Sequence, residues 1–141
     1  MTATDPKLVY VELDLKVTRT SSPVPVRALH DSGCAKTIMS TNTYHKLHQT
    51  QPIHLKKLKN VSISSCTGEK TRPMGYVSVY MAFSDNKGNT LMFPFDILVH
   101  EALDHDMLLG RDFTGSRYKS FETNSHIYLT DADPTLSLIH I

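Results

Sequence analysis

The first clear pattern in the chain is a strict alternation of apolar and polar residues in LVYVELDLKV, residues 8–17. A period of two is typical of a β-strand with one buried face. The next segment, TRTSSPVPV at residues 18–26, contains two serines and two prolines and predicts a turn or exposed loop. Extended apolar character resumes in VRAL, residues 26–29. We therefore expect a hairpin that brings Asp31 to the end of its second strand.

A short buried strand and a helix are expected after this hairpin. KTIMS, residues 36–40, combines β-branched and apolar residues, which favour a strand. In STNTYHKLHQ, residues 40–49, apolar side chains recur at helical spacing, and Ser40 or Thr41 can cap the first turn.

The rest of the chain consists of short strand candidates separated by turn residues. Two alternating segments between Val61 and Phe83 flank CTGE, residues 66–69, which suits the tip of a long hairpin. Asp85, Asn86 and Gly88 predict a further turn. The remaining expected elements are a strand up to Val99, an apolar run closing on Gly110 with a helical turn after it, and strands at residues 126–131 and 136–141.

These elements predict a single all-β domain over residues 1–141. Seven to nine closely spaced short strands with one or two short helices are typical of a β-barrel or sandwich. With 141 residues and 40% hydrophobic content, the chain is long enough for one modest core. We expect residues 1–7 and 131–141 to be flexible or dimer-forming ends.

Composition narrows the possible partners. The 15 basic and 14 acidic residues nearly cancel, which argues against nucleic acid, and no apolar run is long enough to cross a membrane. Two cysteines and a start without signal-peptide character favour an intracellular, cytoplasmic protein. His45, His48 and His54 leave a metal-binding β-protein as the weakest alternative, and we expect no metal and no cofactor.

The strongest chemical signal lies in ALHDSGCAKTIMS, residues 28–40. A lone Asp-Ser-Gly triplet is usually a simple turn. Here, however, Asp31 follows an apolar run, Gly33 permits close approach of another backbone, and a second apolar run closes on Gly110, 79 positions downstream. These features together indicate a site rather than a turn.

The same residues carry a family resemblance. ALHDSGCAKTIMS resembles the active-site strand and loop of retropepsins, the aspartic proteases of retroviruses and LTR retrotransposons, and HDMLLGRDF, residues 105–113, resembles a segment near their C-terminal end. The resemblance implies a small closed β-barrel of the acid-protease type with a glycine-tipped flap hairpin. It also implies a homodimer in which each chain donates Asp31. Two such carboxylates share a proton, and together they activate a water that attacks the peptide bond.

The resemblance also assigns roles to individual residues. Ser32 would lock the two active-site loops across the dimer, and Gly33 would present its carbonyl to the substrate. Ile38 and Leu108 would line pockets for apolar side chains of an extended polypeptide. Structural support would come from the packing of Leu109 and Gly110 and from Arg111. The flap tip, also counted among the substrate-binding residues, would be Cys66, Thr67 and Gly68.

Several positions depart from the pattern of the resembled family. His30 stands at a usually apolar position and, by strand alternation, should point away from Asp31. Ala35 occupies the place of a carboxylate that pairs with the arginine, so Arg111 needs another partner, such as Asp112, Asp106 or a carbonyl. Cys34 is expected to be a small buried hydrophobe, with a redox-sensitive thiol as the alternative.

The sequence thus predicts a homodimeric aspartic endopeptidase that processes a retrotransposon- or retrovirus-like polyprotein, its own being the natural substrate. Such an enzyme would work in the cytoplasm or within virus-like particles. Two alternatives remain open. One is a domesticated cellular protease of the same type, and the other is an inactive retropepsin-like module for dimerisation or peptide binding.

Overall fold

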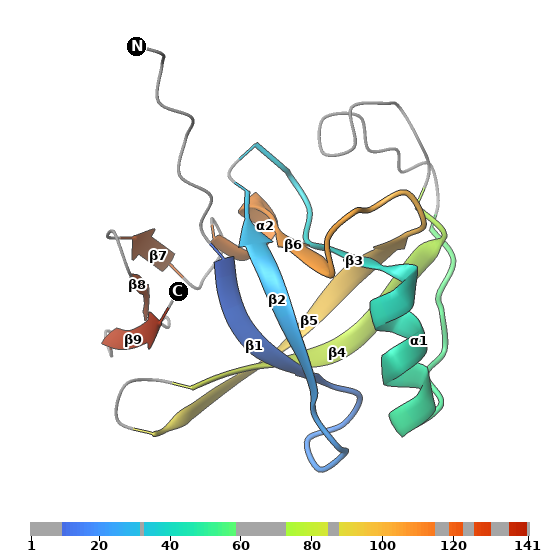
Figure 1. The fold of residues 1–141 in the computed structure, drawn as a ribbon, viewed down its shortest axis with the longest axis horizontal. Coiled ribbons are helices and arrows are strands. Elements are labelled where there is room, and N and C mark those ends of the chain that lie inside the picture. The colour runs from blue at the N-terminus through green and yellow to red at the C-terminus, as the bar shows by residue number, and fades with distance from the viewer. Residues whose placement is uncertain are drawn as a thin grey trace.

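The computed structural model describes residues 10–31, 33–58, 73–84, 88–114, 119–122, 126–130 and 136–140. Within these ranges the chain forms nine strands and two helices. Figure 1 shows them along the chain: β1 (Tyr10–Lys16), β2 (Val24–His30), β3 (Ile38–Ser40), α1 (Thr41–Thr50), β4 (Gly75–Ser84), β5 (Thr90–His100), β6 (Met107–Leu109), α2 (Arg111–Thr114), β7 (Lys119–Glu122), β8 (His126–Thr130) and β9 (Leu136–His140).

Six of the strands close into a barrel in the order β1-β2-β6-β3-β5-β4. The β1–β2 and β4–β5 pairs are antiparallel hairpins, whereas β6 runs parallel to β2 and β3 runs parallel to β5. Closure removes the exposed edges that an open sheet would leave. The predicted class, an all-β closed barrel with short helices, is confirmed.

The first hairpin follows the alternation in the sequence. In β1, Val11, Leu13 and Leu15 are buried, and the polar residues between them are not. One part of the prediction is wrong: Pro25 is not in the loop but inside β2, paired with Asp14. Because β2 meets its other neighbour, β6, only at residues 28–30, the missing N–H of this exposed proline costs no barrel hydrogen bond on that side.

The barrel interior holds the main core, which gathers apolar side chains from β1, β2, β4, β5 and β6. Three phenylalanines meet at one end of this core, with ring centroids 5.6–6.2 Å apart: Phe83, Phe93 and Phe113. Aromatic pairs at such distances contribute beyond their buried area. Phe113 belongs to α2, so this cluster fixes the segment that follows β6.

Helix α1 begins where the sequence predicts. The N-cap is Ser40, whose hydroxyl accepts a hydrogen bond from the Thr43 backbone N–H at 3.2 Å. The Thr43 hydroxyl in turn donates to the Asp106 carbonyl at 3.0 Å, and the Ser40 N–H donates to the same carbonyl. The start of the helix therefore anchors the loop between β5 and β6.

The second predicted hairpin is only partly described. Its second strand is confirmed as β4, which pairs with β5. Of the turn residues predicted between these strands, Gly88 has a φ of +84°, whereas Asp85 and Asn86 lie outside the described residues. The first strand and the tip at residues 66–69 lie outside the described residues. The predicted strands near the C-terminus are present as β8 and β9, and β7 was not predicted.

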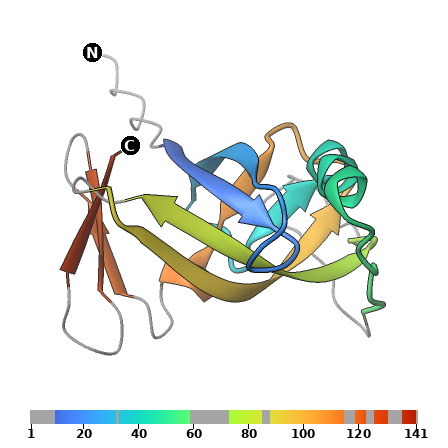
Figure 2. The same cartoon turned by 90° about the horizontal axis from the view of Figure 1, so that it is seen from below.

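Strands β7, β8 and β9 form a separate antiparallel sheet. In Figures 1 and 2 this sheet lies at the opposite end of the molecule from helix α1. None of the described helices combines the length and the apolar character that crossing a membrane requires.

Candidate active site

Asp31 directly follows β2 at one end of the barrel, and its side chain is partly exposed. Its backbone N–H donates to the Leu109 carbonyl at 3.0 Å, and its carbonyl accepts from the Cys34 N–H at 3.1 Å. The first bond extends the contact between β2 and β6 by one residue, and the second closes a turn in the loop that follows. The backbone at Asp31 is therefore fixed by a strand that lies far away in the sequence.

The Asp31 carboxylate accepts a hydrogen bond from the Gly33 N–H, 2.9 Å from Oδ1. A β-carbon at position 33 would lie 3.2 Å from the same oxygen, tighter than most real contacts. Glycine therefore lets the loop fold back close to the carboxylate. Ser32, predicted to lock two loops across a dimer, lies outside the described residues.

Gly110 packs directly beneath the loop that follows Asp31. A β-carbon there would come within 2.5 Å of the Lys36 carbonyl and 2.9 Å of the Cys34 carbonyl oxygen, closer than real β-carbons approach. The next residue, Arg111, donates its backbone N–H to the Cys34 carbonyl at 2.8 Å. The two motifs are thus in contact, as the sequence predicts for a combined site.

The backbone of Ala35 joins the same contact. Its carbonyl accepts the Asp112 N–H at 3.1 Å. Ala35, which lacks the carboxylate expected from the resemblance, therefore serves the site through its main chain.

A buried threonine links the two motifs by its hydroxyl. Thr37 is fully buried, and its Oγ1 accepts a hydrogen bond from the Gly110 N–H at 3.1 Å while donating to Asp112 Oδ1 at 2.7 Å. Bonds to a carboxylate are stronger than neutral ones. The sequence analysis did not identify this pair. Its only signal in the sequence was a hydroxyl residue six positions after Asp31 and a carboxylate two positions after Gly110.

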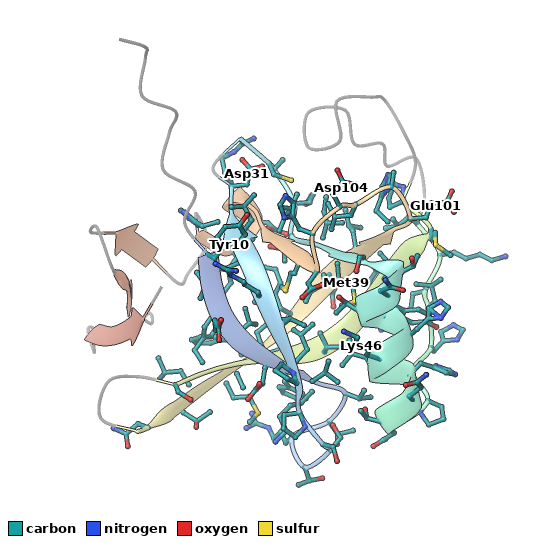
Figure 3. The ribbon with its side chains drawn as sticks, viewed as in Figure 1. Tyr10, Asp31, Met39, Lys46, Glu101 and Asp104 are labelled. Atoms are coloured by element: carbon teal, nitrogen blue, oxygen red, sulfur yellow. The ribbon has the colours of Figure 1, made fainter. Side chains whose placement is uncertain are left out.

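A small pocket of about 150 Å³ borders Asp31. Three leucines supply its apolar side: Leu29, Leu103 and Leu108. The loop between β5 and β6 also contributes Asp104 and His105. Figure 3 shows Asp31 and Asp104 at the same end of the barrel. The sequence did not single out Asp104, and the position of its loop depends on the contacts with α1 described above.

Strand register explains which predicted residues reach this pocket. Leu29 pairs with Leu108, which pairs with Ile38 across β6 and β3. These three side chains belong to a second apolar cluster, distinct from the main core, together with Cys34 and Leu98. Leu108 lines the Asp31 pocket, whereas Ile38 is fully buried within the cluster and does not line that pocket.

The register also places the residues next to these positions. His30 pairs with Leu109, and Leu109 belongs to the main core. Since adjacent residues of a strand face opposite sides, His30 and Leu109 lie on the face away from Leu29 and Leu108. In agreement with the expectation that it points away from Asp31, His30 is not among the residues that line the Asp31 pocket.

Cys34 is completely buried in the second cluster, as expected, and it is disulfide-bonded rather than a free thiol. The predicted flap-tip residues Cys66, Thr67 and Gly68 lie outside the described residues.

No group of three histidine, cysteine or acidic side chains close enough to hold a metal ion occurs in the described part of the chain. Of the histidines considered for a metal, His45 and His48 contact the Tyr44 ring. The Nδ1 atom of His48 also accepts a hydrogen bond from the Ile53 N–H at 3.2 Å. These side chains thus have structural contacts within and just after α1.

Comparison with known proteins identifies the fold of the chain. No protein-family model matches the chain, and no curated protein sequence matches it significantly. Among solved structures, the chain is similar to the retroviral protease-like domain of Ddi1 from Leishmania major. The match has a TM-score of 0.55 and 16% sequence identity, and it covers 96% of this chain and 95% of that one. The chain therefore has a retropepsin-like fold.

Proposed function

We propose that this chain is an aspartic endopeptidase that acts as a homodimer, each copy contributing Asp31. The observation that carries the proposal is the placement of Asp31: a partly exposed carboxylate at the end of a barrel strand, beside a small and mainly polar pocket that three leucines also line, in a retropepsin-like fold. Ser32 and Gly33 complete the proposed catalytic loop. Leu109, Gly110 and Arg111 support it from beneath.

The proposed reaction needs a second carboxylate and a water. Two nearby carboxylates share one proton, so that the ionised member takes a proton from water while the protonated member polarises the peptide carbonyl. The water oxygen adds to the carbonyl carbon, and the C–N bond then breaks as the amine leaves with a proton. No covalent intermediate with the enzyme forms.

The proposed substrate is an extended polypeptide with an apolar residue beside the cut bond. Leu29, Leu103 and Leu108 give the pocket next to Asp31 its apolar side. Such peptides bind largely through their main chains, with side-chain pockets setting the preference. We further propose a retrotransposon- or retrovirus-like polyprotein as the natural substrate, with the predicted flap residues Cys66, Thr67 and Gly68 covering it.

The experiment is a cleavage assay at acidic pH with peptides centred on two apolar residues, combined with sedimentation. We expect cleavage to be lost in Asp31→Asn. The matched control is Asp14→Asn, because Asp14 lies on β1 and does not line the Asp31 pocket. Cleavage that survives in Asp31→Asn would contradict the proposal.

Subunit mixing tests the shared dyad. Wild-type and Asp31→Asn chains are mixed at a constant total concentration. If each copy supplies one Asp31, activity falls with the square of the wild-type fraction, because mixed dimers hold only one aspartate. A fall in direct proportion to the wild-type fraction would show that a single chain suffices. A purified dimer that cleaves nothing would favour the inactive dimerisation or peptide-binding module.

A further inference from the structure

The β5–β6 loop, residues 101–106, forms one side of the Asp31 pocket. Four consecutive residues of this loop line the pocket, from Ala102 to His105. Asp104, labelled in Figure 3, is one of them. Since the loop belongs to no helix or strand, its place beside Asp31 has to be fixed by individual contacts.

The end of the β5–β6 loop that leads into β6 is held by the start of α1. The Asp106 carbonyl accepts hydrogen bonds from the Ser40 N–H and from the Thr43 hydroxyl, each at 3.0 Å. The middle of the loop contacts the first hairpin, where the rings of His105 and Tyr10 lie 6.2 Å apart. Both contacts lie after the residues with which the loop begins.

His100, the last residue of β5, holds the start of the β5–β6 loop. Its Nδ1 atom accepts a hydrogen bond from the Ala102 backbone N–H at 3.0 Å. The imidazole is buried, with 1% of the residue exposed, whereas Ala102 is exposed. A side chain that accepts from the N–H two residues ahead closes a tight turn, a role that asparagine and aspartate commonly fill. The buried ring therefore fixes the direction in which the chain leaves β5.

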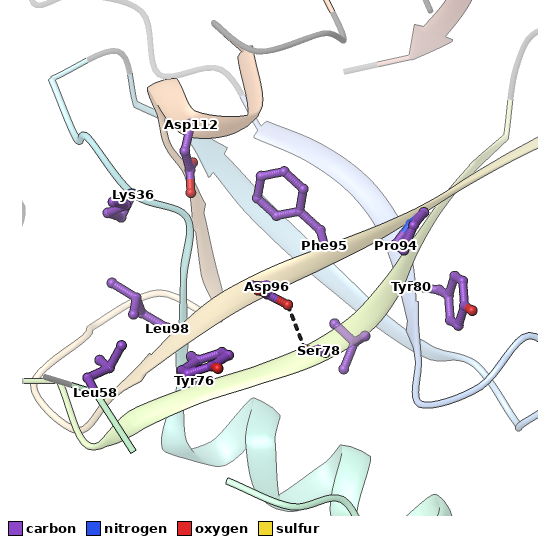
Figure 4. Close-up of a pocket in the computed structure, with 11 residues that line it drawn as sticks. Lys36, Leu58, Tyr76, Ser78, Tyr80, Pro94, Phe95, Asp96, Leu98 and Asp112 are labelled. Carbon is purple, nitrogen blue, oxygen red and sulfur yellow. Dashed lines mark hydrogen bonds between the residues drawn. The ribbon is translucent and has the colours of Figure 1, made fainter. Parts of the chain in front are cut away.

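A larger pocket, of about 640 Å³, is lined mainly by β4 and β5 and is independent of this loop (Figure 4). Both of its carboxylates, Asp96 and Asp112, accept hydrogen bonds from hydroxyl groups of the chain, at 2.6 and 2.7 Å. It shares no lining residue with the Asp31 pocket. Of these two pockets, the β5–β6 loop lines only the one at Asp31, so a displaced loop changes that pocket alone.

We propose that His100 is a positioning residue for the proposed proteolysis. By accepting the Ala102 N–H, its Nδ1 atom keeps the β5–β6 loop in the arrangement that binds peptide beside Asp31. This inference rests on the proposed function and adds a residue that does not itself line the pocket. When the bond is lost, the loop populates other arrangements, and peptide affinity falls with the fraction of chains in the competent one. The Asp31 backbone is bonded to Leu109 instead, so the chemical step is unaffected.

The test compares His100→Leu with His100→Asn in the cleavage assay. The two new side chains are similar in size, but only asparagine keeps an acceptor that reaches the N–H two residues ahead. We expect KM to rise by about three- to fivefold in His100→Leu with kcat little changed, and to return close to the wild-type value in His100→Asn. Equal KM values in the two variants would overturn the inference and leave the proposed function standing.

His48→Leu is the matched control for loss of a histidine acceptor. The Nδ1 atom of His48 also accepts a backbone N–H, from Ile53 at 3.2 Å, but His48 does not line the Asp31 pocket or contact the β5–β6 loop through this bond. Its KM should equal that of the wild type. A rise in KM as large as that in His100→Leu would show a general effect of lost histidine and refute the specific role.

Nuclear magnetic resonance tests the bond without relying on cleavage. At mildly alkaline pH, where histidines are neutral, the long-range proton–nitrogen spectrum of wild-type protein should show the His100 proton on Nε2, because Nδ1 is an acceptor. Exchange of the Ala102 amide should be about fivefold faster in His100→Leu than in His100→Asn. A proton on Nδ1, or equal exchange in the two variants, would refute the positioning role. If wild-type protein cleaves nothing while both signals are present, proteolysis fails and the role of His100 in placing the loop stands.

Discussion

Replacing Gly110 with alanine tests whether the site depends on close packing of two distant segments. The new β-carbon would lie 2.5 Å from the Lys36 carbonyl, where ordinary contact begins at 3.4 Å. The backbone must therefore shift by about 1 Å to remove the overlap between the new β-carbon and the Lys36 carbonyl. Neither neighbour is a flexible side chain, since both obstructing carbonyls, of Lys36 and Cys34, are main-chain groups.

The cost of this shift follows from the bonds around Gly110. Overpacking a rigid interior typically costs about 1–3 kcal/mol. The same displacement strains hydrogen bonds from Gly110 to Thr37 and from Arg111 to Cys34, each contributing about 1 kcal/mol. We expect Gly110→Ala to lower the free energy of unfolding by about 2–5 kcal/mol.

Equilibrium unfolding in urea measures this loss. The chain has no tryptophan and 6 tyrosines, so circular dichroism and tyrosine fluorescence are the suitable signals. Gly33→Ala is the matched control: its β-carbon meets only a side-chain oxygen, at 3.2 Å, and the residue is exposed. It should change stability by less than about 1 kcal/mol while disturbing the Asp31 carboxylate. A loss below about 1 kcal/mol in Gly110→Ala would refute the packing argument.

Two further predictions concern hydroxyl groups. Thr37→Val should destabilise by about 2–3 kcal/mol, because it leaves the buried Gly110 N–H without its acceptor and removes the bond to Asp112, whereas Thr37→Ser should restore most of the stability. Equal urea midpoints for the two variants would count against this role. Ser40→Ala should cost about 1 kcal/mol through loss of the N-cap bond to Thr43 and lower the thermal midpoint seen by circular dichroism. An unchanged midpoint would show that the cap is dispensable.

The sequence predicted those parts of the fold that depend on local patterns. The sequence predicted the alternation in β1 and β4 and narrowed the N-cap of α1 to Ser40 or Thr41, because burial of one face and satisfaction of the first helical N–H groups are local requirements. Pro25 was misplaced, because whether a strand tolerates proline depends on its neighbour across the sheet.

The site was predictable only in part, for the same reason. Asp31 and Gly110 carry recognisable motifs, and the structure brings them together. Thr37 and Asp104 belong to no motif of their own, since their roles follow from the order of strands in the barrel. The burial of Ile38, which was expected to line a pocket, likewise depends on its two strand neighbours, Leu98 and Leu108.

The two faces of the barrel wall between β2 and β5 pack in two different apolar clusters, which limits the substitutions that the site tolerates. Alternate residues of these strands pack the main core on one side, as Met107 and Val99 do, and build the second cluster on the other, as Leu108 and Leu98 do. A change in register would exchange the two faces. Substitutions that shift this wall should therefore lower stability and activity together, whereas Asp31→Asn, at the end of β2 and outside both clusters, should affect activity alone. That separation distinguishes loss of chemistry from loss of the supporting fold.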